Sequence, residues 1–122
     1  MFSALYFKEF GIKVTVFERG EKVEERAKSI EKFITSGILN TESNIQFGEG
    51  GAGTWSDGKL TNRGKDKRAK FVFEEFVKAG APKEIAYLAH PHLGSDNLKI
   101  IVQRLRELYE SIGGKILFET EF

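Results

Sequence analysis

Five glycines cluster in the segment 44–60, which reads NIQFGEGGAGTWSDGKL. Positions 48, 50 and 53 satisfy the G-x-G-x-x-G pattern of dinucleotide-binding turns, and positions 53, 58 and 59 satisfy the G-x-x-x-x-G-K pattern of P-loops. Both patterns bind phosphate through backbone N–H groups, which glycine leaves open to close approach. Phosphate binding is therefore the first chemistry that this sequence suggests.

Neither pattern has the flanking structure that its chemistry requires. A dinucleotide turn precedes an acidic strand end, whereas Glu18, which ends a predicted strand, comes before the glycines. In a P-loop, Ser or Thr follows the lysine, whereas Leu60 follows Lys59 here. Ser56 and Asp57 among the glycines favour a ligand-facing loop, with a plain surface turn as the alternative.

Glu18 is the second candidate for ligand binding. It follows an apolar, β-branched run at residues 12–17, and a carboxylate at such a strand tip can accept hydrogen bonds from both ribose hydroxyls of an adenosine. Arg19 would then lie on the phosphate or adenine side of the nucleotide. The same residues also make an ordinary strand exit, so both interpretations stay open.

Metal binding and nucleophilic catalysis have weaker support. His90 and His92 could approach one ion from an extended segment, but there is no Cys, and Asp96 is the only further ligand in view. A loop pair next to the following helix is the favoured interpretation. We expect no metal site, and the spacing identifies no catalytic residue.

The composition excludes several classes of partner. Nineteen basic and 18 acidic residues give a net charge of +1, which offers no bulk attraction to nucleic acid or to an anionic membrane. The chain has no cysteine, and its first residues lack the pattern of a signal peptide or a membrane span. We expect a cytoplasmic protein.

Hydrophobic periodicity predicts the elements that carry these residues. Helices are expected over residues 3–10, 21–36, 66–79 and 96–112, with a helical turn over 83–88 and glycines as stops. A buried strand is expected over 12–17 and a second strand over 115–122. Ser95 or Asp96 should cap the last helix. The order indicates an α/β fold, with helices packed on a small, mostly parallel sheet.

Two long stretches of the sequence resemble a known family. The run LNTESNIQFGEGGAGTWSDGKL, following VTVFERG, and the run APKEIAYLAHPHLGSDNLKIIVQRLRELYESIGGKILFETEF are similar to bacterial FAD-dependent dehydrogenases described as NAD- or FAD-utilizing. These belong to the glutathione-reductase-like class of flavoproteins. The resemblance covers essentially the whole chain.

The resemblance implies a Rossmann-like FAD-binding fold and a set of cofactor contacts. Glu18 would bind the adenosine ribose with Arg19 beside it, and the end of the strand 115–122 would contact adenine through Glu121 or Phe122. The loop would lie along the pyrophosphate and flavin, through Gly50, Gly51, Ala52, Gly53, Ser56, Asp57 and Lys59. NAD(P)H would be a possible electron donor, and the substrate would be an unknown small molecule.

Family members begin with a strand and a G-x-G-x-x-G turn, which this sequence lacks. We therefore expect residues 1–122 to form an incomplete FAD-binding domain from an FAD-dependent oxidoreductase, without its first strand, its phosphate turn and its C-terminal remainder. Two alternatives stay open. One is a non-catalytic segment that self-associates through the unpaired strand 12–17. The other is a simple adenine-nucleotide-binding module that uses Glu18.

Overall fold

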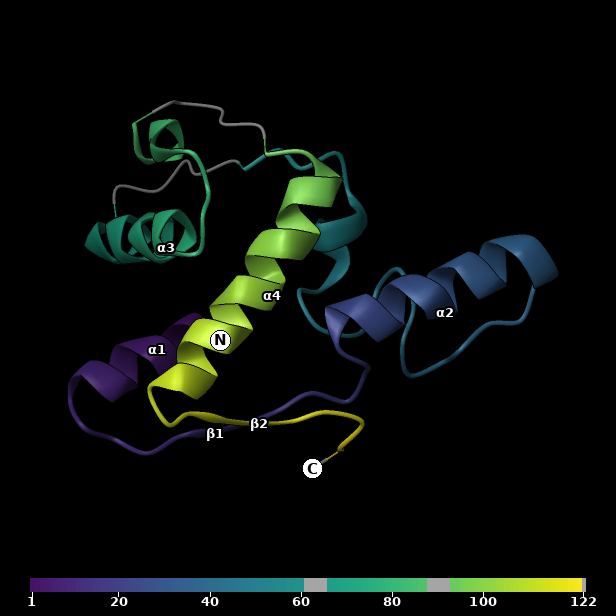
Figure 1. Cartoon of the computed structure of the whole chain (residues 1–122), viewed down its shortest axis with the longest axis horizontal. Coiled ribbons are helices and arrows are strands. Elements are labelled where there is room, and N and C mark those ends of the chain that lie inside the picture. Colours follow the sequence, from purple (N-terminus) through teal and green to yellow (C-terminus); the bar gives the residue numbers. More distant parts are fainter. Residues whose placement is uncertain (61–65, 88–92, 122) are drawn as a thin grey trace.

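The computed structural model describes residues 1–60, 66–87 and 93–121. Its helices and strands are α1 (Phe2–Glu9), β1 (Thr15–Phe17), α2 (Val23–Ser36), α3 (Lys67–Lys78), α4 (Ser95–Ser111) and β2 (Lys115–Leu117) (Figure 1). Two short 3₁₀ helices, η1 (Ala52–Trp55) and η2 (Lys83–Ala86), lie between them. This mixed composition confirms the predicted α/β class.

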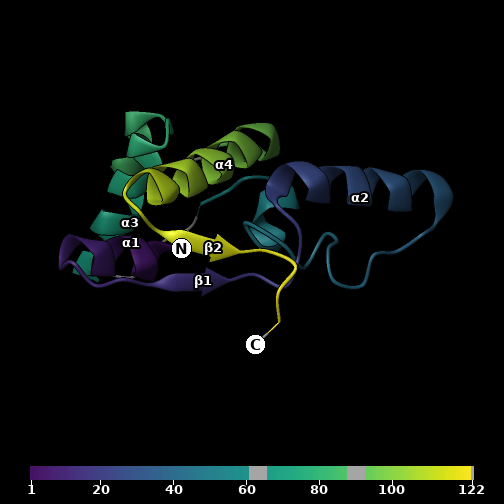
Figure 2. The same cartoon turned by 60° about the horizontal axis from the view of Figure 1, so that its bottom comes forward.

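The two strands form a parallel sheet. Val16 pairs with Ile116 at the centre of the register, and the chain between the strands passes through α2, α3 and α4. A parallel pair requires such a long crossover, because the chain must return to the same end of the sheet. In Figure 2 the strands run side by side, with α4 above them and α2 extending away beyond their ends.

Both strands differ from their predicted extent. β1 was expected to be buried over residues 12–17, but only three residues are strand, and Phe17 is 46% exposed. The expectation of burial was wrong because β1 has one paired neighbour among the described residues. The predicted strand 115–122 ends at Leu117, since the chain then bends to bring the Thr120 N–H to the Glu18 carbonyl, at 3.1 Å.

The helices follow the predicted spans to within a residue or two. Residues at their ends explain where some of them begin and end. Gly37 adopts a left-handed conformation after α2, with φ of 72°. The Asp66 carboxylate caps α3 by accepting from the Arg68 N–H at 2.8 Å. The predicted cap of α4 was wrong: Ser95 is already helical, and Gly94 stands at the cap position without a side-chain bond.

The core lies between α1, α3, α4 and the sheet. Its most buried residue is Tyr109 of α4, with no exposed surface, and its hydroxyl donates to the Val14 carbonyl at 2.6 Å. Gly114 makes this packing possible, because a Cβ there would lie 2.4 Å from the Tyr109 ring. The tyrosine thereby ties the long helix to the chain that enters β1.

The outer half of α2 stands apart from this core. Val23 and Ile30 are buried, as their helical spacing predicts, but Ile34 on the same predicted stripe is 73% exposed. Figure 1 shows the outer part of α2 extending away from the body, next to the loop that returns from it. The first turns of α2 therefore pack closely against the body of the molecule, whereas Ile34 near its end does not.

Candidate functional site

The tip of β1 lies directly against the glycine-rich loop. A Cβ placed on Gly20 would lie 2.5 Å from the Gly48 Cα, so the two backbones touch with no room for a side chain. Nearby, the Glu49 N–H donates to the Glu21 carbonyl at 3.1 Å. Glu18 and the glycines, which were separate candidates in the sequence, therefore belong to one region at the carboxyl end of the sheet.

The side chain of Arg26 holds the glycine-rich loop in shape. It is fully buried, and its guanidinium donates to five backbone carbonyls, those of Asn44, Ile45, Gly48, Glu49 and Gly51, at 2.6–3.3 Å. Burial lowers the pKa of Arg26 from its usual value, whereas the negative charges of Glu18 and Glu49 oppose this effect. The loop backbone is therefore folded around one cation rather than left open.

Trp55 closes the other side of the Arg26 side chain. The guanidinium carbon lies 4.2 Å from the centre of the indole ring, and the Lys99 ammonium from α4 lies 5.4 Å from the same centre. Such cation–π contacts gain strength when the cation is withdrawn from water. The single tryptophan of the chain thus packs on the residue that organises the loop.

Glu49 connects the loop to two helices. Its Oε2 accepts from the Val23 N–H of α2 at 2.8 Å and from Arg106 Nη1 of α4 at 2.8 Å. Arg106 also pairs with Glu24, so one buried arginine joins α2, α4 and the loop. Among the described residues, the buried Glu49 Oε1 has no hydrogen-bond partner.

The burial of Glu49 changes its titration. Removal of its carboxylate from water raises its pKa from 4.5 to about 7, against the opposing effects of the Val23 N–H and Arg106. Glu24 behaves in the opposite way, because its hydrogen bond from Arg106 lowers its pKa. The two carboxylates on Arg106 therefore titrate in different pH ranges.

A cavity of about 260 Å³ lies beside Glu49. Its walls are largely apolar side chains from α1, α3 and α4, namely Phe2, Phe76, Leu98, Val102 and Leu105. The loop supplies its polar side, through Glu49, Gly50, Gly53, Thr54, Ser56 and Lys59. Such a mostly apolar hollow with few polar groups is the usual form of a small-molecule site.

The structure brings together some of the predicted cofactor contacts. Gly50, Gly53, Ser56 and Lys59 line the cavity described above. Gly51 and Ala52 belong to the same loop, at the start of η1, but do not line this cavity.

The polar side chains of the loop bond largely to the loop itself. Ser56 Oγ donates to the Gly53 carbonyl at 2.7 Å, and Asp57 accepts from the Lys59 N–H at 3.2 Å and pairs with its ammonium at 2.9 Å. These contacts shape the turn around Gly58, as the alternative interpretation of a plain surface turn predicts. The exposed Lys59–Asp57 pair raises the pKa of Lys59.

The predicted nucleotide contacts at the strand tip lie in different surroundings. Glu18 is half-buried, and its Oε1 accepts from the Gly20 N–H at 2.8 Å. Arg19 lies 2.7 Å from Glu42 and stacks over the Phe47 ring, at the rim of a second cavity that also touches Glu121. Phe122 lies outside the described residues.

The three residues that hold this region together were missed in the sequence. Arg26, Glu49 and Arg106 are charged residues with at most 7% exposure. Arg26 lies between Val23 and Ile30 on the apolar stripe of its helix. A charged residue at such a position can be recognised in the sequence as one that becomes buried. A charge at that position must find a buried partner, although the sequence alone does not name it.

Three further predictions concerned the histidine pair, metal binding and membrane spanning. The histidine pair at positions 90 and 92 lies outside the described residues. No group of three or more possible metal ligands occurs among the residues that the structure does describe. Within that same part of the chain, no helix is both long and apolar enough to span a membrane.

The chain is similar to a known protein, although not to a known family. No protein-family profile matches the chain. It is 50% identical over 121 residues to a protein of Clostridium beijerinckii that carries the name "Uncharacterized protein". The match covers 99% of this chain and 23% of that relative, so the chain spans about a quarter of the length of the protein it matches.

Proposed function

We propose that this chain forms part of the FAD-binding site of an FAD-dependent oxidoreductase. The observation that carries the proposal is the contact between Gly20 and Gly48, which places the acidic strand tip next to the glycine-rich loop. In open α/β sheets, nucleotide cofactors bind beyond the carboxyl ends of the strands. The proposal also draws on the resemblance of both segments to the flavoprotein family.

The described residues fit parts of a dinucleotide cofactor. The Gly20 N–H fixes one oxygen of Glu18 and so orients a carboxylate toward which ribose hydroxyls can donate. The loop offers glycine backbone beside a cavity, and its fold does not depend on a ligand because Arg26 holds it. A preformed loop reduces the cost of ordering when a ligand binds.

In the proposed enzyme, a bound flavin would supply the redox chemistry, and the protein would bind and orient it. The apolar walls of the cavity would exclude water from whatever ring lies there. NAD(P)H as electron donor and a small organic molecule as substrate are part of the same proposal. No catalytic residue is assigned.

The test compares this chain with its longer relative from Clostridium beijerinckii. Each protein is expressed with FAD supplied, desalted and measured for visible flavin absorbance. We expect the longer protein to retain FAD. Replacement of its residue that aligns with Glu18 should weaken retention, whereas replacement of its residue that aligns with Glu25, an exposed position of α2, should leave retention unchanged. If both proteins are colourless with FAD in excess, the proposed function is wrong.

A second candidate is a non-catalytic role through self-association, which one observation favours. Among the described residues, only β2 pairs with β1, and Phe17 and Ile12 are each nearly half exposed. An open strand edge can pair with another chain. Sedimentation at several concentrations should then show a dimer that Phe17→Lys removes, and a monomer throughout would contradict it.

A further inference from the structure

The carboxylate of Glu49 has one oxygen that the fold does not satisfy. Oε2 is held by the Val23 N–H and by Arg106, whereas Oε1 is buried and has no hydrogen-bond partner among the described residues. Nearly all buried polar atoms in folded proteins have a partner, so an exception points to a missing donor. The residue is 7% exposed and borders the cavity beside the loop.

The cavity restricts what that donor can be. The apolar side chains from α1, α3 and α4 dominate its walls, which does not suit a metal ion that needs several oxygen ligands. A phosphate would meet the negative Glu49 at close range. Its volume, about 260 Å³, is below the roughly 300–1,000 Å³ of sites for whole drug-sized ligands. The space therefore suits one ring system rather than a complete dinucleotide.

We propose that this cavity binds a flat heterocycle that donates an N–H hydrogen bond to Glu49 Oε1 and packs its faces against Phe2, Phe76 and Val102. Glu49 thereby selects rings with a donor edge over rings that carry only acceptors. The inference deepens the proposed function and rests on it where the ring is one end of FAD. Both the isoalloxazine and the adenine of FAD have N–H donors, so the shared chemistry is that of a donating heterocycle.

Arg106 explains why the site uses Oε1 rather than Oε2. The guanidinium and the Val23 N–H occupy Oε2 and fix the plane of the carboxylate. The remaining oxygen then has a fixed direction before a ligand arrives. A hydrogen bond to a pre-oriented carboxylate is among the stronger kinds, so a ring N–H at Oε1 would favour the ionised form of Glu49.

The experiment measures binding of riboflavin and of adenosine to the 122-residue chain and to three variants by isothermal titration calorimetry. Glu49→Gln keeps the size of the side chain but leaves one acceptor oxygen for three donors. These donors are the Val23 N–H, Arg106 Nη1 and the ring N–H. Val102→Phe fills the cavity without touching the carboxylate. Glu24→Gln is the matched control, because it removes a partner of Arg106 that does not line the cavity.

We expect at least one of the two probes to bind the unmodified chain, with affinity reduced about tenfold or more in Glu49→Gln and in Val102→Phe. Glu24→Gln should change the affinity less than about threefold. If Glu49→Gln does not fold, as judged by circular dichroism, the Val102→Phe result decides. Binding that is unchanged in the folded variants, or no binding of either probe, would overturn the inference.

The outcome also separates this inference from the proposed function. Glu49-dependent binding of a ring by a chain whose longer relative retains no FAD would support the cavity and contradict the flavoprotein proposal. Alternatively, the longer relative retains FAD, and the substitution there that matches Glu49→Gln leaves this retention unchanged. That result would support the flavoprotein proposal and contradict the inference about the cavity. The two probes tell which end of the cofactor enters the cavity.

Discussion

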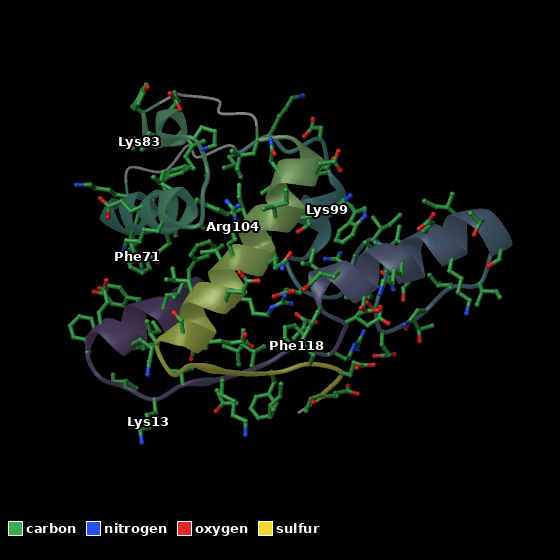
Figure 3. The ribbon with its side chains drawn as sticks, in the orientation of Figure 1. Lys13, Phe71, Lys83, Lys99, Arg104 and Phe118 are labelled. Atoms are coloured by element: carbon green, nitrogen blue, oxygen red, sulfur yellow. The ribbon has the colours of Figure 1, made fainter. Side chains whose placement is uncertain are left out.

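Arg106 Nη1 lies 2.8 Å from Glu49 Oε2, and this buried ion pair joins the last helix to the glycine-rich loop. Arg106 is 4% exposed, and its guanidinium also reaches Glu24 on α2. Phe118 lies next to β2 (Figure 3), and its ring is 5.8 Å from the Arg106 guanidinium. Three segments far apart in sequence therefore depend on one side chain.

Replacement of Arg106 should destabilise the protein strongly. Arg106→Met keeps much of the apolar volume but leaves Glu49 buried without its cation, which we expect to cost about 3–5 kcal/mol in the free energy of unfolding. Urea denaturation followed by circular dichroism measures this. Arg104→Met, on the same helix but exposed, is the control and should cost less than about 1 kcal/mol. Equal effects of the two substitutions would show that the ion pair is not the cause.

The stability of the protein should fall as pH rises from about 5 to about 8. The pKa of Glu49 is raised from 4.5 to about 7 by burial, so the folded state binds a proton more firmly than the unfolded chain between these values. Its contribution is fully present below about pH 4.5 and is lost as pH rises through about 7, with a magnitude of at most about 3 kcal/mol. Glu24, whose pKa is lowered, and Arg106, whose pKa is raised, keep their charges across this range.

Comparison with Glu49→Gln isolates this contribution. Both proteins share every other titratable group, so the difference between their urea midpoints reports on residue 49. Below about pH 4.5 the lowered pKa of Glu24 acts with the opposite sign, since its stabilisation is present above that pH and is lost on acidification. A pH-independent difference between the two proteins would contradict the prediction.

Lysine should not replace Arg26. An ammonium group cannot donate to five carbonyls arranged around a planar guanidinium, so Arg26→Lys should loosen the loop and cost about 3 kcal/mol. Trp55 is the single tryptophan and stacks on Arg26, so its fluorescence emission should shift to the red. Lys28→Ala, at an exposed site on the same helix, should leave the emission unchanged. An unshifted spectrum in Arg26→Lys would contradict the role given to Arg26.

Gly48 should tolerate alanine less well than Gly37 does. Both have positive φ, 112° and 72°, and alanine pays about 1 kcal/mol for such a conformation. A Cβ on Gly37 meets nothing within 4 Å, whereas a Cβ on Gly48 would lie 2.6 Å from Arg26 Cδ. We expect about 3 kcal/mol for Gly48→Ala, measured as the change in unfolding free energy. Similar costs for both would mean that the Arg26 side chain moves aside freely.

The local elements of this protein could be predicted because their signals are local. The apolar spacing of α4 and the glycines after α1, α2 and α4 define where those helices lie, since helix formation depends on neighbours within a few residues. The order of helices and strands was sufficient to indicate a parallel pairing of β1 and β2. The exposure of Phe17 was not predictable, because it depends on which neighbours the sheet has.

The candidate site shows the same division between sequence and tertiary structure. The sequence by itself determined that residues 44–60 form a non-periodic loop rich in glycine and that Glu18 directly follows a strand. Only the tertiary structure decided that Gly20 packs on Gly48, that Arg26 carries the loop, and that Glu49 meets Arg106 across 57 positions. A charged residue on an apolar stripe indicates burial, but its partner depends on how distant segments pack, which local spacing does not encode.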